Sequence, residues 1–270
     1  ASNNGLATSS TRRGLATYTT SSDTWSYLED DDSNADTFTP GVGYSVKRGL
    51  DTGNISFTGT INTTDIGINV SLSNVGNRFN VLGNPYTSFI NSITFLNNEG
   101  AISETKTIWV WNQGLGENGT YQVKTIGSNF IIAPGQGFFV KANATGGTFN
   151  FSEANQSHNG GTDTFQKTEE TKTEIKLSIT DGTIHQLASI HYLDNATTGF
   201  DVGYEGEVFI GSSYKAFAIY TNLVSNNLGK NYQVQSLPKD YENLVIPIGI
   251  NAKSGKEIAF STETLNLPSN

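Results

Sequence analysis

The chain has 270 residues, and its 16 basic and 25 acidic side chains give a formal net charge of −9. This charge repels phosphate backbones and anionic lipid surfaces, which argues against nucleic acid as a partner. The sequence has no cysteine, and no apolar run approaches the roughly 20 residues that a membrane-spanning helix needs. We therefore expect neither disulfide nor thiol chemistry, and no membrane insertion.

The composition favours an all-β fold. Hydrophobic residues make up 35% of the chain and charged residues 15%, and 29 glycines punctuate it together with many Ser, Thr and Asn residues. This balance is typical of short strands joined by many turns. The length suits one large or two ordinary domains, and we expect two.

The first half of the chain contains a repeat. Residues 40–47 (PGVGYSVK) match 134–141 (PGQGFFVK), and 53–57 (GNISF) match 147–151 (GTFNF) at the same offset. Each copy reads as a Pro-Gly turn, a strand, a loop and a second strand. The pattern predicts two related hairpins.

An aromatic pair precedes each copy, Trp25 with Tyr27 and Trp109 with Trp111. A spacing of two places both members of a pair on one face of a strand. Because each copy leaves an apolar face uncovered, we expect the two copies to pack against each other. The predicted first domain, residues 1–163, is a β-sandwich with a jelly-roll-like arrangement.

One short helix is predicted inside this domain. Asn84-Pro85 is a helix-start signal, and apolar residues follow at helical spacing from Tyr86 to Ile93. Further on, residues 152–173 are mostly polar and read as a linker. We place the domain boundary near residue 164.

Residues 164–270 are expected to form a second β-sandwich-like domain. Ile175, Leu177 and Ile179 alternate with polar residues, and Asp181-Gly182 supplies the chemistry of a hairpin turn. Pro247 inside a later run indicates an edge strand or a bulge. The later runs that read as strands are 207–210, 216–220, 232–234, 244–250 and 257–261.

Several separated motifs carry a resemblance to a known family. They are Leu82–Tyr86 (LGNPY), Ile108–Asn112 (IWVWN), Ala133–Val140 (APGQGFFV), Gly199–Tyr204 (GFDVGY) and Val245–Gly249 (VIPIG). In this order they resemble the C-terminal β-rich regions of Bacteroidetes type IX secretion system cargo. Such cargo comprises secreted or cell-surface adhesins and polysaccharide-active proteins. The similarity extends from about residue 39 onward.

The resemblance implies an extracellular or cell-surface location. It also implies a position between a working domain and a terminal sorting domain, with the type IX export machinery as partner through a C-terminal signal. Because the chain stops at Asn270, where more strands would follow, we interpret the second domain as truncated before that signal. The leading hypothesis is a non-catalytic structural or adhesive module, and the alternative is a carbohydrate-binding module.

The patterns that could carry catalysis do not support an enzyme. Residues 114–119 fit GxGxxG by letter, but Tyr121 begins a strand where the dinucleotide motif needs a helix. His185 and His191 would share a strand face about 20 Å apart, too far to bind one metal. We expect that face to be exposed to solvent. Neither a GxSxG nor an HExxH pattern occurs.

Acidic residues offer hypothetical Ca²⁺ sites, with no other cofactor expected. Hard oxygen ligands suit Ca²⁺, although the acidic loop of the first domain lacks the EF-hand alternation and equally fits a solvated surface. Its candidate ligands are Asp30, Asp31, Asp32 and Asp36. A weaker group in the second domain comprises Asp194, Asp201, Glu205 and Glu207.

The aromatic pairs admit two interpretations. Trp25, Tyr27, Trp109 and Trp111 could form flat platforms on which sugar rings stack, which would make a polysaccharide the partner. They could equally pack within a sandwich core, where buried Trp is common. Since both copies of the repeat keep a pair at the same place, core packing explains both copies, and we favour it.

Overall fold

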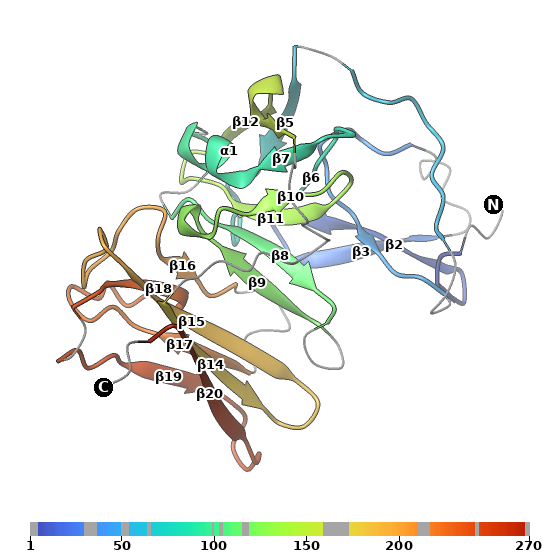
Figure 1. Ribbon diagram of the computed structural model, residues 1–270. Helices are drawn as coiled ribbons and strands as arrows, with labels where there is room; N and C mark the ends of the chain where they lie inside the picture. Colours follow the sequence, from blue (N-terminus) through green and yellow to red (C-terminus); the bar gives the residue numbers. More distant parts are fainter. Residues whose placement is uncertain are drawn as a thin grey trace. The chain divides into compact units, whose positions relative to one another are not determined.

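The computed structural model describes most of the chain (Figure 1). Its elements are mostly strands, which confirms the all-β, β-sandwich-like prediction. No helix among the residues that the structure describes is long and apolar enough to cross a membrane. The described residues are 5–29, 37–49, 54–63, 66–98, 100–102, 105–114, 119–158, 173–209, 217–240 and 243–267.

The chain divides into two compact units, and each is discontinuous in sequence. Unit 1 comprises Ala1–Ile102 and Ile131–Asn159, and unit 2 comprises Ser103–Phe130 and Gly160–Asn270. The segment 103–130, placed in the first domain from the sequence, thus groups with unit 2. The boundary predicted near residue 164 lies outside the described residues.

Unit 1 is built from short antiparallel strands. Strand β2 pairs with β1, β3 and β4, strand β7 pairs with β10 and β13, and two further pairs are β6–β11 and β5–β12. The bounds are β1 Thr8–Ser9, β2 Arg12–Thr19, β3 Thr24–Glu29, β4 Ser45–Val46, β5 Ile68–Leu72, β6 Phe79–Gly83, β7 Phe89–Asn91, β10 Ile131–Ile132, β11 Gly137–Lys141, β12 Gly147–Phe151 and β13 Gln156–Ser157.

The two copies of the repeat flank one strand, β6. Leu82 pairs with Val42 of the first copy and with Phe138 of the second. Gly43 donates its backbone N–H to the Val81 carbonyl at 3.1 Å, and a Cβ at Gly43 would come within 2.5 Å of the Leu82 carbonyl oxygen. Glycine is therefore required for this close approach.

Neither copy of the repeat forms a hairpin from its own two segments, because β11 pairs with β6 and β12 pairs with β5. Residues 147–151 make β12, whereas the described residues 54–57 of the first copy carry no strand. Phe57 instead packs edge-on against Phe38, with ring centroids 4.9 Å apart, and is half exposed. The prediction of two related hairpins is therefore wrong, because the strands of the second copy pair with β6 and β5, and β4 of the first copy pairs with β2.

The short helix α1 (Ser92–Asn98) is present in unit 1 but begins later than the sequence indicated. The Asn91 side-chain oxygen accepts the backbone N–H of Ile93 at 2.9 Å, as a helix N-cap does. The segment after Pro85 instead forms a turn and strand β7. The predicted start was wrong because Phe89–Asn91 pair as strand β7 with β10 and β13.

The Asn84 side chain joins two of the sequence motifs, LGNPY and APGQGFFV. It accepts the Tyr86 N–H at 3.0 Å and donates to the carbonyls of Ser88 at 2.8 Å and Ala133 at 3.1 Å. The backbone N–H of Asn84 donates in turn to the Gln136 carbonyl at 3.1 Å. Asn84 is buried, so these bonds satisfy an amide that would be costly to leave unpaired.

Unit 2 contains a larger sheet in the order β19-β17-β18-β15-β14-β20, with β16 pairing to β18. All its described pairs are antiparallel except β15–β18, which is parallel. Strand β19 is an edge strand that starts directly after Pro247, as predicted. The bounds are β14 Thr173–Thr180, β15 His185–Leu193, β16 Gly206–Glu207, β17 Ala218–Thr221, β18 Tyr232–Pro238, β19 Ile248–Asn251 and β20 Ala259–Leu265.

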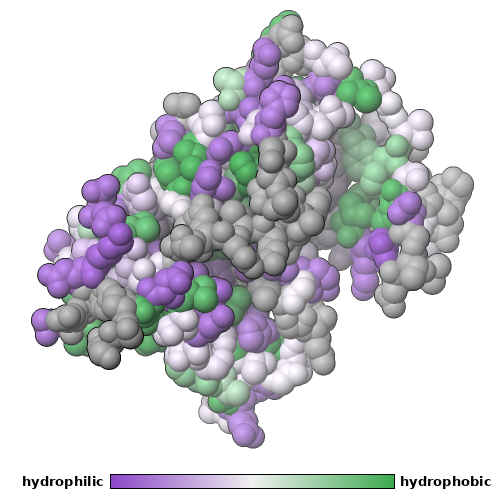
Figure 2. Space-filling model, viewed as in Figure 1, coloured by the Kyte–Doolittle hydropathy of each residue, from purple (hydrophilic) through white to green (hydrophobic). Residues whose placement is uncertain are grey.

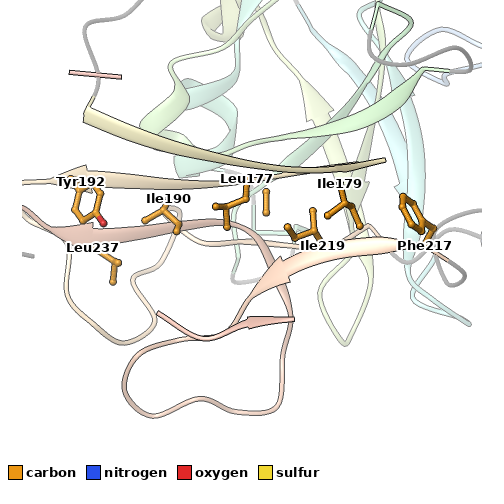
Figure 3. Close-up of a cluster of buried hydrophobic side chains, with 8 residues drawn as sticks. Leu177, Ile179, Ile190, Tyr192, Phe217, Ile219 and Leu237 are labelled. Atoms are coloured by element: carbon orange, nitrogen blue, oxygen red, sulfur yellow. The ribbon is translucent and has the colours of Figure 1, made fainter. Parts of the chain in front are cut away.

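One face of this sheet covers an apolar core (Figure 3). The alternation of Leu177 and Ile179 along β14 places both on this face, where they meet Ile190 of β15 and Ile219 of β17. The predicted hairpin at Asp181-Gly182 is confirmed by the β14–β15 pairing, and the Asp181 side chain accepts the Ile184 N–H at 2.8 Å.

The opposite face of the sheet lies near a second hairpin, β8 (Ile108–Asn112) and β9 (Thr120–Lys124), which also belongs to unit 2. The buried indole of Trp109 donates to the Glu207 carbonyl at 3.1 Å. Gly206 makes this approach possible, because a Cβ there would lie 2.1 Å from a methyl carbon of Val123. The motif IWVWN therefore anchors the hairpin inside unit 2.

Candidate functional site

Unit 2 contains a cleft of about 560 Å³ lined by the β8–β9 hairpin and by strands β14, β15 and β18. Its apolar lining includes Val110, Val123, Leu187 and Val234. Polar and charged side chains interrupt this lining: Asn112, Gln122, Lys124, Ser128, Glu174, Lys176, Ser189, His191, Gln233 and Asn266. The cleft combines apolar walls with hydrogen-bonding groups, which is typical of ligand sites.

A carboxylate–imidazole pair lies in the cleft. Glu174 and His191 are cross-strand partners on β14 and β15, and His191 Nε2 lies 3.3 Å from Glu174 Oε1. Burial opposes ionisation of Glu174, but hydrogen bonds from His191 and Ser189 and the positive charge nearby lower its pKa to about 2. Glu174 is thus held as a carboxylate.

His191 corrects the expected exposure of the two histidines. Its side chain is 10% exposed, because the β8–β9 hairpin lines the same cleft over this face of the sheet. His185 is partly exposed at the other end of β15. The sequence indicated that this strand face points to solvent, which is wrong at His191.

Two lysines place positive charge in the cleft. The Lys176 Nζ lies 3.8 Å from Oε2 of Glu263 on β20, and the Lys176 side chain is 38% exposed. The Lys124 ammonium group lies 5.3 Å from the centre of the Phe130 ring, a cation–π distance. An exposed ion pair such as Lys176–Glu263 is weak, so the Lys176 ammonium group can exchange partners at little cost.

Polar contacts fix the hairpin to the sheet. The Gln233 side chain donates to the carbonyls of Tyr121 on β9 and Leu187 on β15, at 3.2 and 3.0 Å. The Thr120 hydroxyl donates to Gln186 at 3.2 Å. These bonds join the two walls of the cleft.

The predicted aromatic pairs lie in different units, and the members of each pair differ in exposure. Trp25 of unit 1 packs against Tyr18 and Phe139, with ring centroids 5.2 and 5.9 Å apart, whereas Tyr27 is 48% exposed. In unit 2, Trp109 is fully buried and Trp111 is 42% exposed. One residue of each pair is therefore packed and the other is accessible. On the face drawn in Figure 2, hydrophobic and hydrophilic residues are interspersed.

Trp111 does not line the cleft. Val110 and Asn112 line it, and strand periodicity places the intervening Trp111 on the opposite face of the hairpin. There Trp111 packs edge-on against Tyr121, with centroids 4.9 Å apart, and donates its indole N–H to Gln113 at 3.0 Å. The exposed indole and the cleft are two separate surfaces of the same hairpin.

The acidic candidates have different outcomes. Asp30, Asp31, Asp32 and Asp36 lie outside the described residues. The second group does not converge: Asp194 pairs with Lys239, Glu207 pairs with Lys230, and Asp201 accepts hydrogen bonds from Thr197. Within the described ranges, no group of three or more His, Cys, Asp or Glu side chains is arranged to hold a metal.

Glu205 of this group is buried and has a different role. Its two carboxyl oxygens accept the backbone N–H groups of Asp201 at 2.5 Å and Ser236 at 3.2 Å. Burial raises the pKa of Glu205 to about 8, although these two bonds favour the carboxylate. Glu205 thus joins the 201–205 turn to strand β18.

The glycine-rich segment 114–119 joins β8 to β9. Residues 115–118 lie outside the described residues, and Thr120–Lys124 form an antiparallel strand with Ile108–Asn112. The interpretation of this segment as a hairpin connection is confirmed.

The cleft itself was missed from the sequence. Leu187 and Val234 carried the available signal, because an apolar residue on a face expected to be polar indicates that something covers that face. The covering hairpin ends at Lys124, far upstream of β14, which begins at Thr173, and local periodicity cannot identify such a partner.

These features define an all-β protein of two units, one of which carries a polar cleft. Within that class, the chain belongs to the family described as Domain of unknown function (DUF8693), whose model matches residues 6–266. No curated protein and no solved structure matches the chain.

Proposed function

We propose that this chain is a non-catalytic structural or adhesive module of a bacterial secreted or cell-surface protein exported by type IX secretion. Export and location rest on the order of the motifs from LGNPY to VIPIG. The partners are then the export machinery and a surface or polysaccharide ligand. The two units, each with its own buried side chains, suit a module that presents binding surfaces outside the cell.

The pairing of Glu174 with His191 is the observation that carries the non-catalytic part. An acid catalyst needs a pKa near the working pH, and the pKa of Glu174 is held at about 2. A carboxylate that stays ionised and hydrogen-bonded can position a ligand but cannot donate a proton near neutral pH. Glu174 therefore supports a role in ligand binding rather than in proton donation.

The test is incubation of the whole chain with algal and plant polysaccharides, followed by measurement of new reducing ends and of unsaturated products. We expect neither above the level of a heat-denatured sample. Turnover that disappears in Glu174→Gln but persists in the surface variant Glu263→Gln would overturn the proposal. For location, limited proteolysis of intact producing cells should degrade the protein, and protection until lysis would contradict it.

A second candidate function, a carbohydrate-binding module, is favoured by the exposed indole of Trp111. An aromatic face at this exposure offers a surface for sugar stacking. Its neighbours Tyr121 and Gln113 hold the ring in place.

Acrylamide quenching of tryptophan fluorescence tests this candidate. Of the three tryptophans, Trp109 is fully buried and Trp111 is the most exposed, so Trp111→Phe should remove most of the quenchable signal. In the wild type, a bound polysaccharide should protect the Trp111 fluorescence from quenching. Trp25→Phe is the matched control, and unchanged quenching with every polysaccharide would exclude stacking at Trp111.

A further inference from the structure

We propose that the cleft between the β8–β9 hairpin and strands β14, β15 and β18 binds a negatively charged sugar residue of a polysaccharide. This inference deepens the adhesive function proposed above and rests on it. It assigns the ligand site to the cleft, away from the exposed Trp111.

The dimensions of the cleft suit a small ligand. Its volume of about 560 Å³ lies within the roughly 300–1,000 Å³ that is typical of small-molecule sites. The Gln233 and Thr120 hydrogen bonds join its walls. Little ordering of the protein is then needed on binding, which lowers the entropic cost of association.

The charge of the lining indicates an anionic ligand. The chain carries a net charge of −9, yet among the described residues that line the cleft two lysines, Lys124 and Lys176, accompany one acid, Glu174. Glu174 is itself engaged by His191 at 3.3 Å. The two ammonium groups outnumber the one carboxylate of the lining, which favours a ligand that carries a carboxylate or a sulfate.

The remaining polar groups suit sugar hydroxyls. The amides of Asn112 and Gln122 and the hydroxyl of Ser189 line the same cleft, and amides and hydroxyls both donate and accept hydrogen bonds. Val110 and Leu187 add apolar surface for the C–H faces of a sugar ring. A hydrocarbon ligand would leave these polar groups unsatisfied, whereas a charged sugar would pair them.

Isothermal titration calorimetry on the whole chain tests the inference with three probes. Oligogalacturonate supplies carboxylates, carrageenan oligosaccharide supplies sulfates, and laminarin oligosaccharide is neutral. We expect binding of one or both charged probes, weakening as salt is raised, and at least roughly 10-fold weaker binding of the neutral probe. The better charged probe identifies the anionic group.

Three variants locate the site. Lys176→Gln and Lys124→Gln should each weaken binding of the charged probe by roughly 10-fold, because each removes a charge-assisted contact. Lys239→Gln is the matched control, since Lys239 forms an exposed ion pair with Asp194 and does not line the cleft. Trp111→Ala should leave the affinity unchanged, because Trp111 lies on the other face of the hairpin.

The outcomes separate this inference from the proposed function. Three results would each overturn the inference: no binding of any probe, equal binding of the neutral probe, or binding that is lost in Trp111→Ala but retained in Lys176→Gln. None of these results would contradict the proposed non-catalytic function. Chromatography of the probe after titration checks for cleavage. A cleaved probe would overturn the non-catalytic function, while its dependence on Lys176 would still support the site.

Discussion

The two units use polar side chains in opposite ways. In unit 1 the buried Asn84 amide is occupied by backbone groups of its own unit, and the motif around it is structural. In unit 2, Glu174, Lys176 and His191 line a cleft. A distinctive motif therefore need not mark a binding site, whereas polar groups around a cavity are positioned to contact a ligand.

The largest expected effect comes from breaking the structural motif of unit 1. Asn84→Ala removes three side-chain hydrogen bonds at 2.8–3.1 Å and leaves the carbonyls of Ser88 and Ala133 without this donor. We expect a loss of about 3 kcal/mol in the free energy of unfolding, measured by urea titration with circular dichroism.

The matched control for Asn84 is Asn74→Ala. Asn74 donates one bond of 2.9 Å to the Ala144 carbonyl from an exposed position. Because water can replace that bond, the loss should stay below about 1 kcal/mol. Equal losses in the two variants would show that burial of the Asn84 amide does not determine its contribution.

Local signals explain what could be predicted from the sequence. Period-two alternation and the Asp181-Gly182 turn lie within one continuous stretch, so the β14–β15 hairpin was predicted correctly. The predicted start of α1 was wrong because Phe89–Asn91 pair with strand β10, far along the chain. The cleft requires segment 103–130 to join a sheet that begins at Thr173, and no local pattern encodes that pairing.

The second prediction sharpens the contrast through the acid stability of the cleft. The folded-state pKa of Glu174, about 2, lies below its usual 4.5, so the native state favours the carboxylate. Its contribution is present above pH 4.5 and is lost as the pH falls from 4.5 to 2. Between pH 4.5 and pH 2, we expect the free energy of unfolding of the wild type to fall by about 2 kcal/mol more than that of Glu174→Gln.

The measurement for Glu174 is urea unfolding at closely spaced pH values. Glu263→Gln serves as the control, because Glu263 lies on the neighbouring strand with its side chain 64% exposed. This control should follow the wild-type curve. Parallel curves for the wild type and Glu174→Gln would contradict the ion pair with His191.

The smallest expected effect has the opposite sign and concerns Glu205. Burial raises its folded-state pKa to about 8, so the native state favours the protonated carboxyl. The stabilisation is complete below pH 4.5 and is lost as the pH rises through 8. The two backbone N–H groups still donate to the carboxylate and limit this loss of stability. We expect the melting temperature to fall by about 3 °C between pH 5 and pH 9.

The variant Glu205→Gln should lack this decrease, and the exposed control Glu257→Gln should retain it. A wild-type melting temperature that rises over the same range would contradict the assignment. Since the acid loss at Glu174 and the alkaline loss at Glu205 arise in one unit, the stability difference between the wild type and each variant should change with pH in opposite directions, which separates an ionised carboxylate of the cleft from a protonated carboxyl group that joins a turn to a strand.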